Sequence, residues 1–215
     1  YNFMIFDSMG ALSSHFNDCP THASRPFDRS RDGFVLAAGG GMLVLESLEH
    51  AQQRSANILA EIIAYGSSSD GAEMVTPNGD GAARCMQMAL QQMQQQFPQQ
   101  KIDYINAHGT STPIGDRIEL RSIKQIFGEQ LPVISSTKSL TGHAIGAAGV
   151  HEVIYSTLMM QHGFIAGNAN FSAADDESVE VPLRANTSTQ AISTFMSNSF
   201  GFGGTNASLV VRAWG

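Results

Sequence analysis

Two segments of the chain each place a histidine beside glycine and hydroxyl residues, directly after a predicted strand. The first segment is Asn106–Pro113, which contains His108, and the second is Lys138–His143. Apolar residues over 102–106 and 132–136 predict the two strands, and a helix is predicted after each histidine. Strands that alternate with helices favour an α/β fold in which helices cover both faces of a mixed sheet.

The remaining elements follow from apolar periodicity and from the positions of glycine and proline. Asp116 and Glu119 have the spacing of a capping box at the start of a helix that Gly128 ends. We expect a Gly-interrupted, buried strand pair over 33–46, a short helix over 46–54, a strand over 58–65, a loop over 66–78, helices over 79–96, 116–127 and from just after His143 to about His162, and strands over 191–197 and 207–212.

One internal similarity suggests a duplicated unit. Residues 38–45 and 204–211 both consist of small residues followed by Leu-Val and an aliphatic residue. This pattern hints at two related α/β units, of which the first is mostly missing from the chain. The first residue is Tyr1 instead of Met, which also suggests that the chain begins inside a longer protein.

Charge and cysteine usage exclude several classes of function. The formal net charge is −7, and the 12 Lys and Arg residues form no basic run, which argues against binding nucleic acid. No apolar run reaches the length of a membrane-spanning helix and no signal peptide is evident, so we expect no membrane insertion.

Cys19 and Cys85 give neither a disulfide framework nor metal-ligand spacing, so we expect a cytoplasmic protein without a metal. Only 14% of residues are charged, which suggests that more protein covers much of the surface.

The two histidines are candidates for a catalytic pair. A histidine taken alone is more often a hydrogen-bonded structural residue, but two in matching positions after strands favour a site. Two imidazoles that converge on one oxygen can form an oxyanion hole or hold a carboxylate while it leaves as CO2. Lys138 would supply positive charge near a histidine, and Glu152 could orient Lys138 or a histidine.

Hydroxyl and aromatic residues near these segments allow two interpretations each. Thr110 and Thr112 either stabilise a turn or bind the amide groups of a long substrate arm. Phe200 and Phe202 are either core residues or a movable gate, since the glycines around them permit a change of backbone conformation. The glycine-rich segment lacks the spacing of a phosphate-binding loop.

Three motifs, in this order, resemble those of the β-ketoacyl-acyl carrier protein synthases. The likeness is strongest to the type I condensing enzymes of bacterial type II fatty acid synthesis. The motifs cover residues 106–116, 138–143 with 146–149, and 198–207. The resemblance extends over essentially the whole chain, including residues 6–13 and 31–35.

The resemblance implies a thiolase-like α/β fold with five layers, α-β-α-β-α, built from two similar halves and usually dimeric. Residues 1–57 would be the tail of the N-terminal half, and residues 58–215 would be the C-terminal half. The chain would then be essentially the second half of a duplicated unit.

The resemblance also implies a reaction, a decarboxylating Claisen condensation in fatty acid elongation. An active-site cysteine takes the acyl chain, and malonyl-acyl carrier protein then enters, loses CO2 and attacks the acyl thioester. By motif match, the catalytic residues would be His108, His143, Lys138 and Glu152, and the residues that contact substrate would be Thr110, Thr112, Phe200 and Phe202. Phe202 would gate the acyl pocket. No cofactor is implied beyond the phosphopantetheine arm of the acyl carrier protein, which would be the partner of a homodimer.

The chain departs from the family at the nucleophile, which would lie in the missing half upstream of Tyr1. Cys19 precedes a proline in a loop and Cys85 lies among methionines, so neither matches the nucleophile motif. We therefore expect the 215 residues alone to be inactive. Two alternatives are a thiolase and a catalytically silent subunit of the chain-length-factor type. A thiolase would carry a cysteine where this chain has Phe202–Thr205, and a silent subunit is disfavoured by the two histidines and Lys138.

Overall fold

A five-stranded mixed sheet forms the centre of the molecule. The computed structural model describes residues 2–71, 73–74, 76–175 and 181–215. The strands of the sheet lie in the order β1-β7-β6-β2-β3. They are β1 (Ala60–Ser69), β2 (Tyr104–Asn106), β3 (Val133–Ser135), β6 (Thr194–Phe200) and β7 (Thr205–Ala213). Strand β2 runs parallel to β3 and β6, whereas β7 is antiparallel to β1 and β6.

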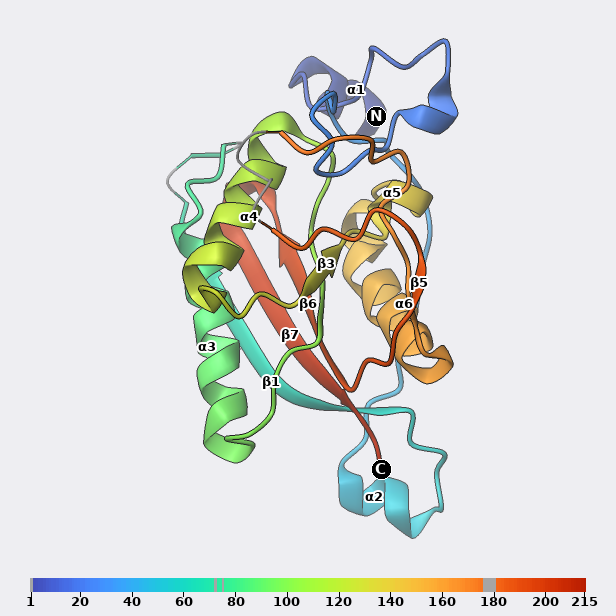
Figure 1. The fold of residues 1–215 in the computed structure, drawn as a ribbon, viewed down its shortest axis with the longest axis vertical. Coiled ribbons are helices and arrows are strands. Elements are labelled where there is room, and N and C mark those ends of the chain that lie inside the picture. Colours follow the sequence, from blue (N-terminus) through green and yellow to red (C-terminus); the bar gives the residue numbers. More distant parts are fainter. Residues whose placement is uncertain (1, 72, 75, 176–180) are drawn as a thin grey trace.

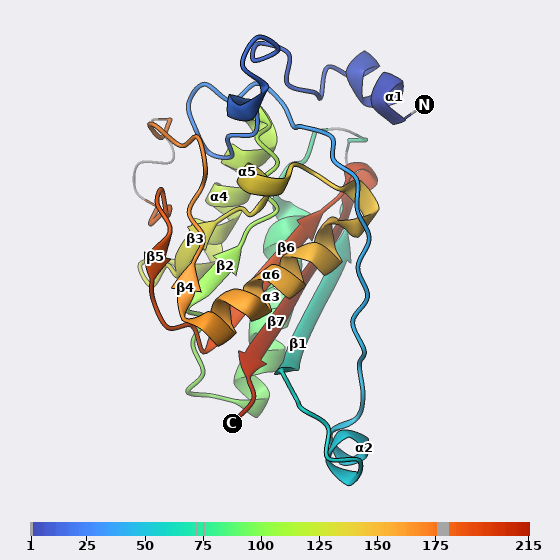
Figure 2. The same cartoon turned by 90° about the vertical axis from the view of Figure 1, so that its right-hand side faces the viewer.

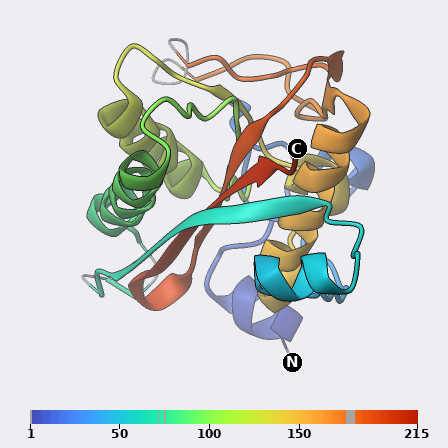
Figure 3. The ribbon, with the colours of Figure 1, turned by 90° about the horizontal axis from the view of Figure 1, so that it is seen from below.

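Helices cover both faces of this sheet, as the sequence predicts (Figures 1 and 3). Helices α3 (Asp80–Gln96) and α4 (Pro113–Phe127) pack on one face, and α6 (Ala148–His162) packs on the other. The short elements are α1 (Asn2–Ser8), α2 (Leu48–Gln53), α5 (Lys138–Thr141), β4 (Phe164–Ile165), β5 (Ser188–Thr189) and the 3-10 turns η1 (Pro20–His22), η2 (Ile145–Ala147) and η3 (Phe202–Gly204). No helix in these described ranges has the length and apolar character of a membrane span.

Each face of the sheet has its own apolar core. Beneath α3 and α4 the core includes Met86, Met93 and Ile123, and beneath α6 it includes Met159 and Phe195. Helix α3 lies so close to β1 that a methyl group on Gly66 would stand 2.0 Å from the carbonyl oxygen of Cys85. Close packing of this kind holds the central strands rigidly, and these strands deliver both histidine segments.

Most of the predicted elements are confirmed. The helix over 79–96 is α3. The helix that ends at His162 is α6, which begins at Ala148 after the turn η2 rather than just after His143, and Gly163 follows it with a left-handed φ of 67°. The strand predicted over 58–65 is longer and extends to Ser69, so β1 takes up the first part of the predicted loop over 66–78. Residues 72 and 75 of that loop lie outside the described residues.

The predicted strand pair over 33–46 is wrong for this chain. Residues 33–46 form an extended segment that runs beside α6 toward α2, with isolated bridges only at Phe34 and Leu36 (Figure 2). Gly41 lies against Val150 of α6. An apolar run becomes a strand only where another strand can pair with it, and the described residues place none beside this segment.

The predicted start of α4 is three residues late. The helix begins at Pro113, with Thr112 as its N-cap residue, because proline suits the first helical position. Asp116 and Glu119 therefore form no capping box. Their buried carboxylates accept hydrogen bonds from the preceding loop, which bears directly on the site.

Candidate active site

The parallel strands β2 and β3 bring the two histidine segments together. His108 follows β2, and His143 follows β3 and the short helix α5. Neighbouring parallel strands end at the same edge of a sheet, so the residues that follow them lie close in space. The imidazole rings of His108 and His143 are 5.3 Å apart between centroids, at an interplanar angle of 85°. The aromatic ring of Phe34 packs edge-on against His143 at 5.3 Å.

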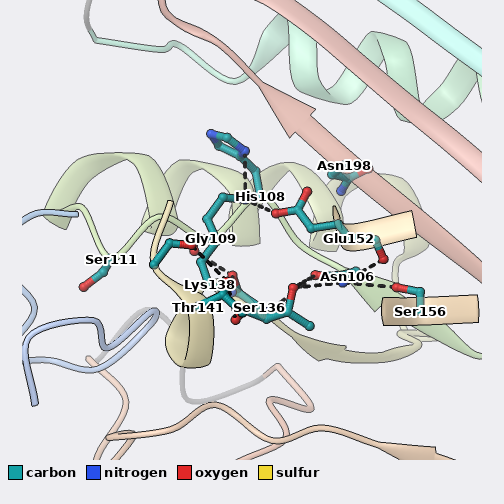
Figure 4. Close-up of polar contacts among 12 residues, drawn as sticks. Asn106, His108, Gly109, Ser111, Ser136, Lys138, Thr141, Glu152, Ser156 and Asn198 are labelled. Carbon is teal, nitrogen blue, oxygen red and sulfur yellow. Dashed lines mark hydrogen bonds and ion pairs between the residues drawn. The ribbon is translucent and has the colours of Figure 1, made fainter. Parts of the chain in front are cut away.

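Lys138 lies behind His108 and pairs with Glu152 (Figure 4). Its Nζ is 3.5 Å from Nδ1 of His108 and forms an ion pair with the Glu152 carboxylate, which comes from α6. Both side chains of the pair are only 2% exposed. Burial raises the pKa of Glu152, and the positive charge of Lys138 opposes that rise. Of the two roles that the sequence allows for Glu152, the structure shows the contact with Lys138.

Both histidines are held in the neutral state. Loss of hydration lowers the pKa of His108 far below its ordinary value, and the charge of Lys138 lowers it further. The same two causes lower the pKa of His143 to about 3. A neutral imidazole donates one hydrogen bond and accepts another. Since the Lys138 ammonium group can only donate, Nδ1 of His108 accepts, and the proton of His108 lies on Nε2.

Two buried carboxylates, predicted as a capping box from their spacing, instead fix the His108 loop. Glu119 accepts hydrogen bonds from the backbone amides of His108 at 2.8 Å and Gly109 at 2.7 Å. Asp116 accepts one from the amide of Ser111 at 3.0 Å. The sequence feature that indicates this role is the same pair of acidic residues, three positions apart. That spacing fits a capping box equally well unless the first residue of the helix is known.

Buried amides on the central strands hold the elements around the site, and the sequence-based prediction did not include them. Asn198 on β6 donates to Glu119 at 3.4 Å and accepts from Ser208 at 2.8 Å. Asn106 at the end of β2 donates to Ser156 of α6 at 3.1 Å. An asparagine within a buried strand is a usable signal, because a buried amide requires several hydrogen-bond partners.

His108 and His143 line a cavity of about 850 Å³. Six of the eight predicted site residues line it, namely His108, His143, Thr110, Thr112, Phe200 and Phe202, while Lys138 and Glu152 lie behind it. The hydroxyl groups of Thr110 and Thr112 are 3.1 Å apart. Phe202 is 44% exposed, and the glycine that follows it has a φ of 78°. Apolar walls with a few polar groups are typical of a ligand-binding site.

Neither cysteine belongs to this cavity. Cys19 is exposed in a loop. Cys85 is buried on α3, its sulfur lies 3.2 Å from the Ser208 hydroxyl oxygen, and burial raises the pKa of its thiol. Within the described ranges, no group of three or more His, Cys, Asp and Glu side chains is arranged to hold a metal ion.

Comparisons with known proteins agree with this architecture. A model of the beta-ketoacyl synthase C-terminal domain matches residues 59–172, and a model of the beta-ketoacyl synthase N-terminal domain matches residues 1–51. The 3-oxoacyl-[acyl-carrier-protein] synthase 1 of Escherichia coli strain K12 is 55% identical over 207 residues, which are 96% of this chain and 50% of that protein. The chain thus spans about half the length of the curated relatives it matches.

Two solved structures show the same fold over nearly the whole chain. A beta-ketoacyl synthase from Burkholderia phymatum STM815 has a TM-score of 0.91 and 39% identity, with 100% of this chain and 52% of that chain covered. The type II polyketide ketosynthase complex AntDE:AntF, which contains an acyl-carrier protein and a bound hexaketide, has a TM-score of 0.91 and 36% identity, with 99% and 53% covered. The predicted thiolase-like α/β fold is confirmed, and the chain corresponds to about half of such structures.

Proposed function

Because this chain belongs to the beta-ketoacyl synthase family, we propose that it is part of an acyltransferase that elongates fatty acids by decarboxylative Claisen condensation. The observation that supports this function is the neutral pair His108 and His143, 5.3 Å apart at the edge of one cavity, with Lys138 behind His108. Its catalytic residues are His108, His143, Lys138 and Glu152.

The two imidazoles act on the thioester oxygen of the malonyl group. When the C–CO2 bond of the malonyl group breaks, CO2 departs. The electron pair of the broken bond stays on the remaining fragment and forms an enolate, whose negative charge develops on the thioester oxygen. N–H groups aimed at an oxygen stabilise that charge most effectively in a site shielded from water. The enolate carbon then attacks the carbonyl of an acyl thioester, and the thiolate of that thioester leaves.

Lys138 and Glu152 maintain the state of His108. The Lys138 charge disfavours protonation of His108 and its ammonium group donates to Nδ1, which directs the remaining N–H of His108 away from Lys138. A buried lysine charge is costly unless it is paired, and Glu152 supplies the pairing charge.

The substrate arm and the nucleophile complete the proposal. Thr110 and Thr112 bind the amide groups of the phosphopantetheine arm, so the partner is an acyl carrier protein. Phe200 and Phe202 line and gate the acyl pocket. Neither Cys19 nor Cys85 lines the cavity, so the acyl group is carried by a cysteine outside this chain, and the 215 residues alone are inactive. The full-length protein is a homodimer in which residues 1–57 and 58–215 belong to different halves.

A catalytically silent subunit of the chain-length-factor type is the second candidate, and the intact histidine pair disfavours it. A subunit that only shapes the pocket of a partner has no use for two neutral imidazoles held beside a buried lysine. A thiolase is disfavoured because Phe202, rather than a cysteine, faces the cavity in the glycine-rich turn.

The test is His108→Ala in the full-length protein. Loss of one stabilising N–H should lower the rate of malonyl decarboxylation at least about 100-fold, while loading of the acyl group onto the cysteine stays measurable. The rates are measured as release of labelled CO2 and as covalent acyl-enzyme. His22→Ala, which changes an exposed histidine, is the matched control. Decarboxylation at the parental rate in His108→Ala would overturn the assignment.

A further inference from the structure

The loop that carries Thr110 and Thr112 is held by a segment far earlier in the chain. Ser111 has an unusual φ of 73°, and its polar groups are bound on several sides. Its hydroxyl accepts from the amide of Arg25 at 3.1 Å, its carbonyl accepts from the amide of Gly33 at 3.0 Å, and its own amide donates to Asp116. A serine persists in a left-handed conformation only where surrounding contacts compensate for the strain.

Arg31, from the same early segment, fixes the end of this loop. Its side chain is 4% exposed. Nε donates to the carbonyl of Thr112 at 3.1 Å, and Nη2 donates to the carbonyl of Pro113 at 2.7 Å. Nη1 donates to the carbonyl of Asp28 at 2.9 Å and pairs with Asp175 at 2.8 Å. The planar guanidinium group is suited to this use, because its donors point in fixed directions that a lysine cannot reproduce.

Arg31 also supports the carboxylate that holds Ser111. Its Nε lies 3.6 Å from Oδ2 of Asp116. Burial raises the pKa of Asp116 to about 6, and the charge of Arg31 opposes that rise. An ionised Asp116 only accepts hydrogen bonds, which suits the backbone amides of Ser111 and Phe27 that it binds.

We propose that Arg31 is a positioning residue for substrate binding: by holding the carbonyls of Thr112 and Pro113, it places the hydroxyls of Thr110 and Thr112 to bind the amide groups of the carrier arm. This inference rests on the proposed function. Arg31 does not line the cavity, so it acts through the loop and touches no reacting atom. The backbone amides of His108 and His143 are held by other groups, the Glu119 carboxylate and the carbonyl of Val35.

The experiment compares two substrates in full-length Arg31→Lys. Malonyl-acyl carrier protein has an arm with amide groups, whereas the malonyl thioester of ethanethiol has none. Arg31→Lys should raise KM for malonyl-acyl carrier protein about tenfold with kcat within about twofold, since the lost contact serves binding and not the chemical step. Decarboxylation of the ethanethiol thioester should not change.

Two further variants accompany it. Arg29→Lys changes an exposed arginine of the same segment and is the matched control. Asp175→Asn leaves Arg31 in place but removes the negative charge of its outer partner, and it should raise the same KM by a smaller factor. If Arg31→Lys fails to fold, Asp175→Asn decides the outcome in its place.

Amide hydrogen exchange separates failure of this inference from failure of the proposed function. The amides of Ser111 and Phe27 should exchange faster in Arg31→Lys than in Arg29→Lys, whether or not the protein is active. An inactive parent would overturn the proposed function, and faster exchange would then still show that Arg31 fixes the loop. Unchanged exchange with an unchanged KM, or an equal loss of activity on both thioesters, would overturn the positioning role.

Discussion

At the scale of single residues, Glu119 links the stability of the protein to pH. Burial raises its pKa from 4.5 to about 7, although the amides of Gly109 and His108 oppose the rise; the negative charge of Asp116 adds to it and Lys138 opposes it. A raised pKa means that the folded state binds this proton more tightly than the unfolded state does. The resulting stabilisation is complete below about pH 4.5 and is lost as the pH increases through about 7.

Glu119→Gln removes this titration. The glutamine keeps one acceptor oxygen but turns an NH2 group toward a backbone N–H, so the variant should be less stable than the parent by about 1–3 kcal/mol at low pH. The difference in free energy of unfolding should narrow between about pH 5 and about pH 8, because only the parent loses stability over that range. Urea unfolding across this range measures it, and exposed Glu129→Gln is the control. A difference that stays constant with pH would contradict the shifted pKa.

At the scale of helices and strands, sequence patterns predicted those elements whose partners lie within the chain. Helix α3 has apolar periodicity and a proline beyond its end, and it packs on β1 and β7 of the same chain. Residues 33–46 carry an equally apolar pattern but have no strand to pair with among the described residues. An apolar local pattern indicates that a segment will be buried, whereas tertiary contacts determine which element buries it.

The residues of the candidate site also fall into those that the sequence pattern predicts and those that depend on tertiary contacts. His108, His143 and Lys138 could be predicted because each follows a strand and parallel neighbours end together. The sequence marks Glu119 and Asn198 as unusual but could not predict what they hold, because their partners depend on where α4 begins and on contacts between distant strands. Chain spacing contains neither piece of information.

The packing of α3 on β1 gives a prediction at this scale. Gly66→Ala places a methyl group 2.0 Å from a backbone oxygen of Cys85 and 2.9 Å from the amide of Ala89, so the helix must move outward. Overpacking against backbone should lower the free energy of unfolding by about 3 kcal/mol. Gly146→Ala is the control, because a methyl group there meets no described atom within 4 Å. Equal urea midpoints for the two variants would show that α3 and β1 are not tightly packed.

At the scale of the whole molecule, one side of the structure is too apolar to face water. Met42 is 87% exposed, Val44 79% and Leu45 70%, in the segment that runs beside α6 (Figure 2). Phe3 and Met4 on α1 are 62% and 72% exposed. Four successive exposed apolar residues, as at 42–45, are typical of an interface. The chain spans about half of its relatives, so we expect other parts of the full-length protein to cover this side.

Val44→Asp in the full-length protein tests whether this side is covered. A carboxylate at a position exposed in solution changes stability by no more than about 0.5 kcal/mol, whereas one buried beneath another layer should cost about 3 kcal/mol or more. Gln95→Asp, in the exposed last turn of α3, is the control and should cost no more than about 1 kcal/mol. The dissociation constant of the dimer then identifies the cover: a constant that Val44→Asp leaves unchanged indicates the same polypeptide, and a constant that Val44→Asp raises indicates the second subunit. Equal stability of the two variants would show that the row of Met42, Val44 and Leu45 faces solvent in the full-length protein.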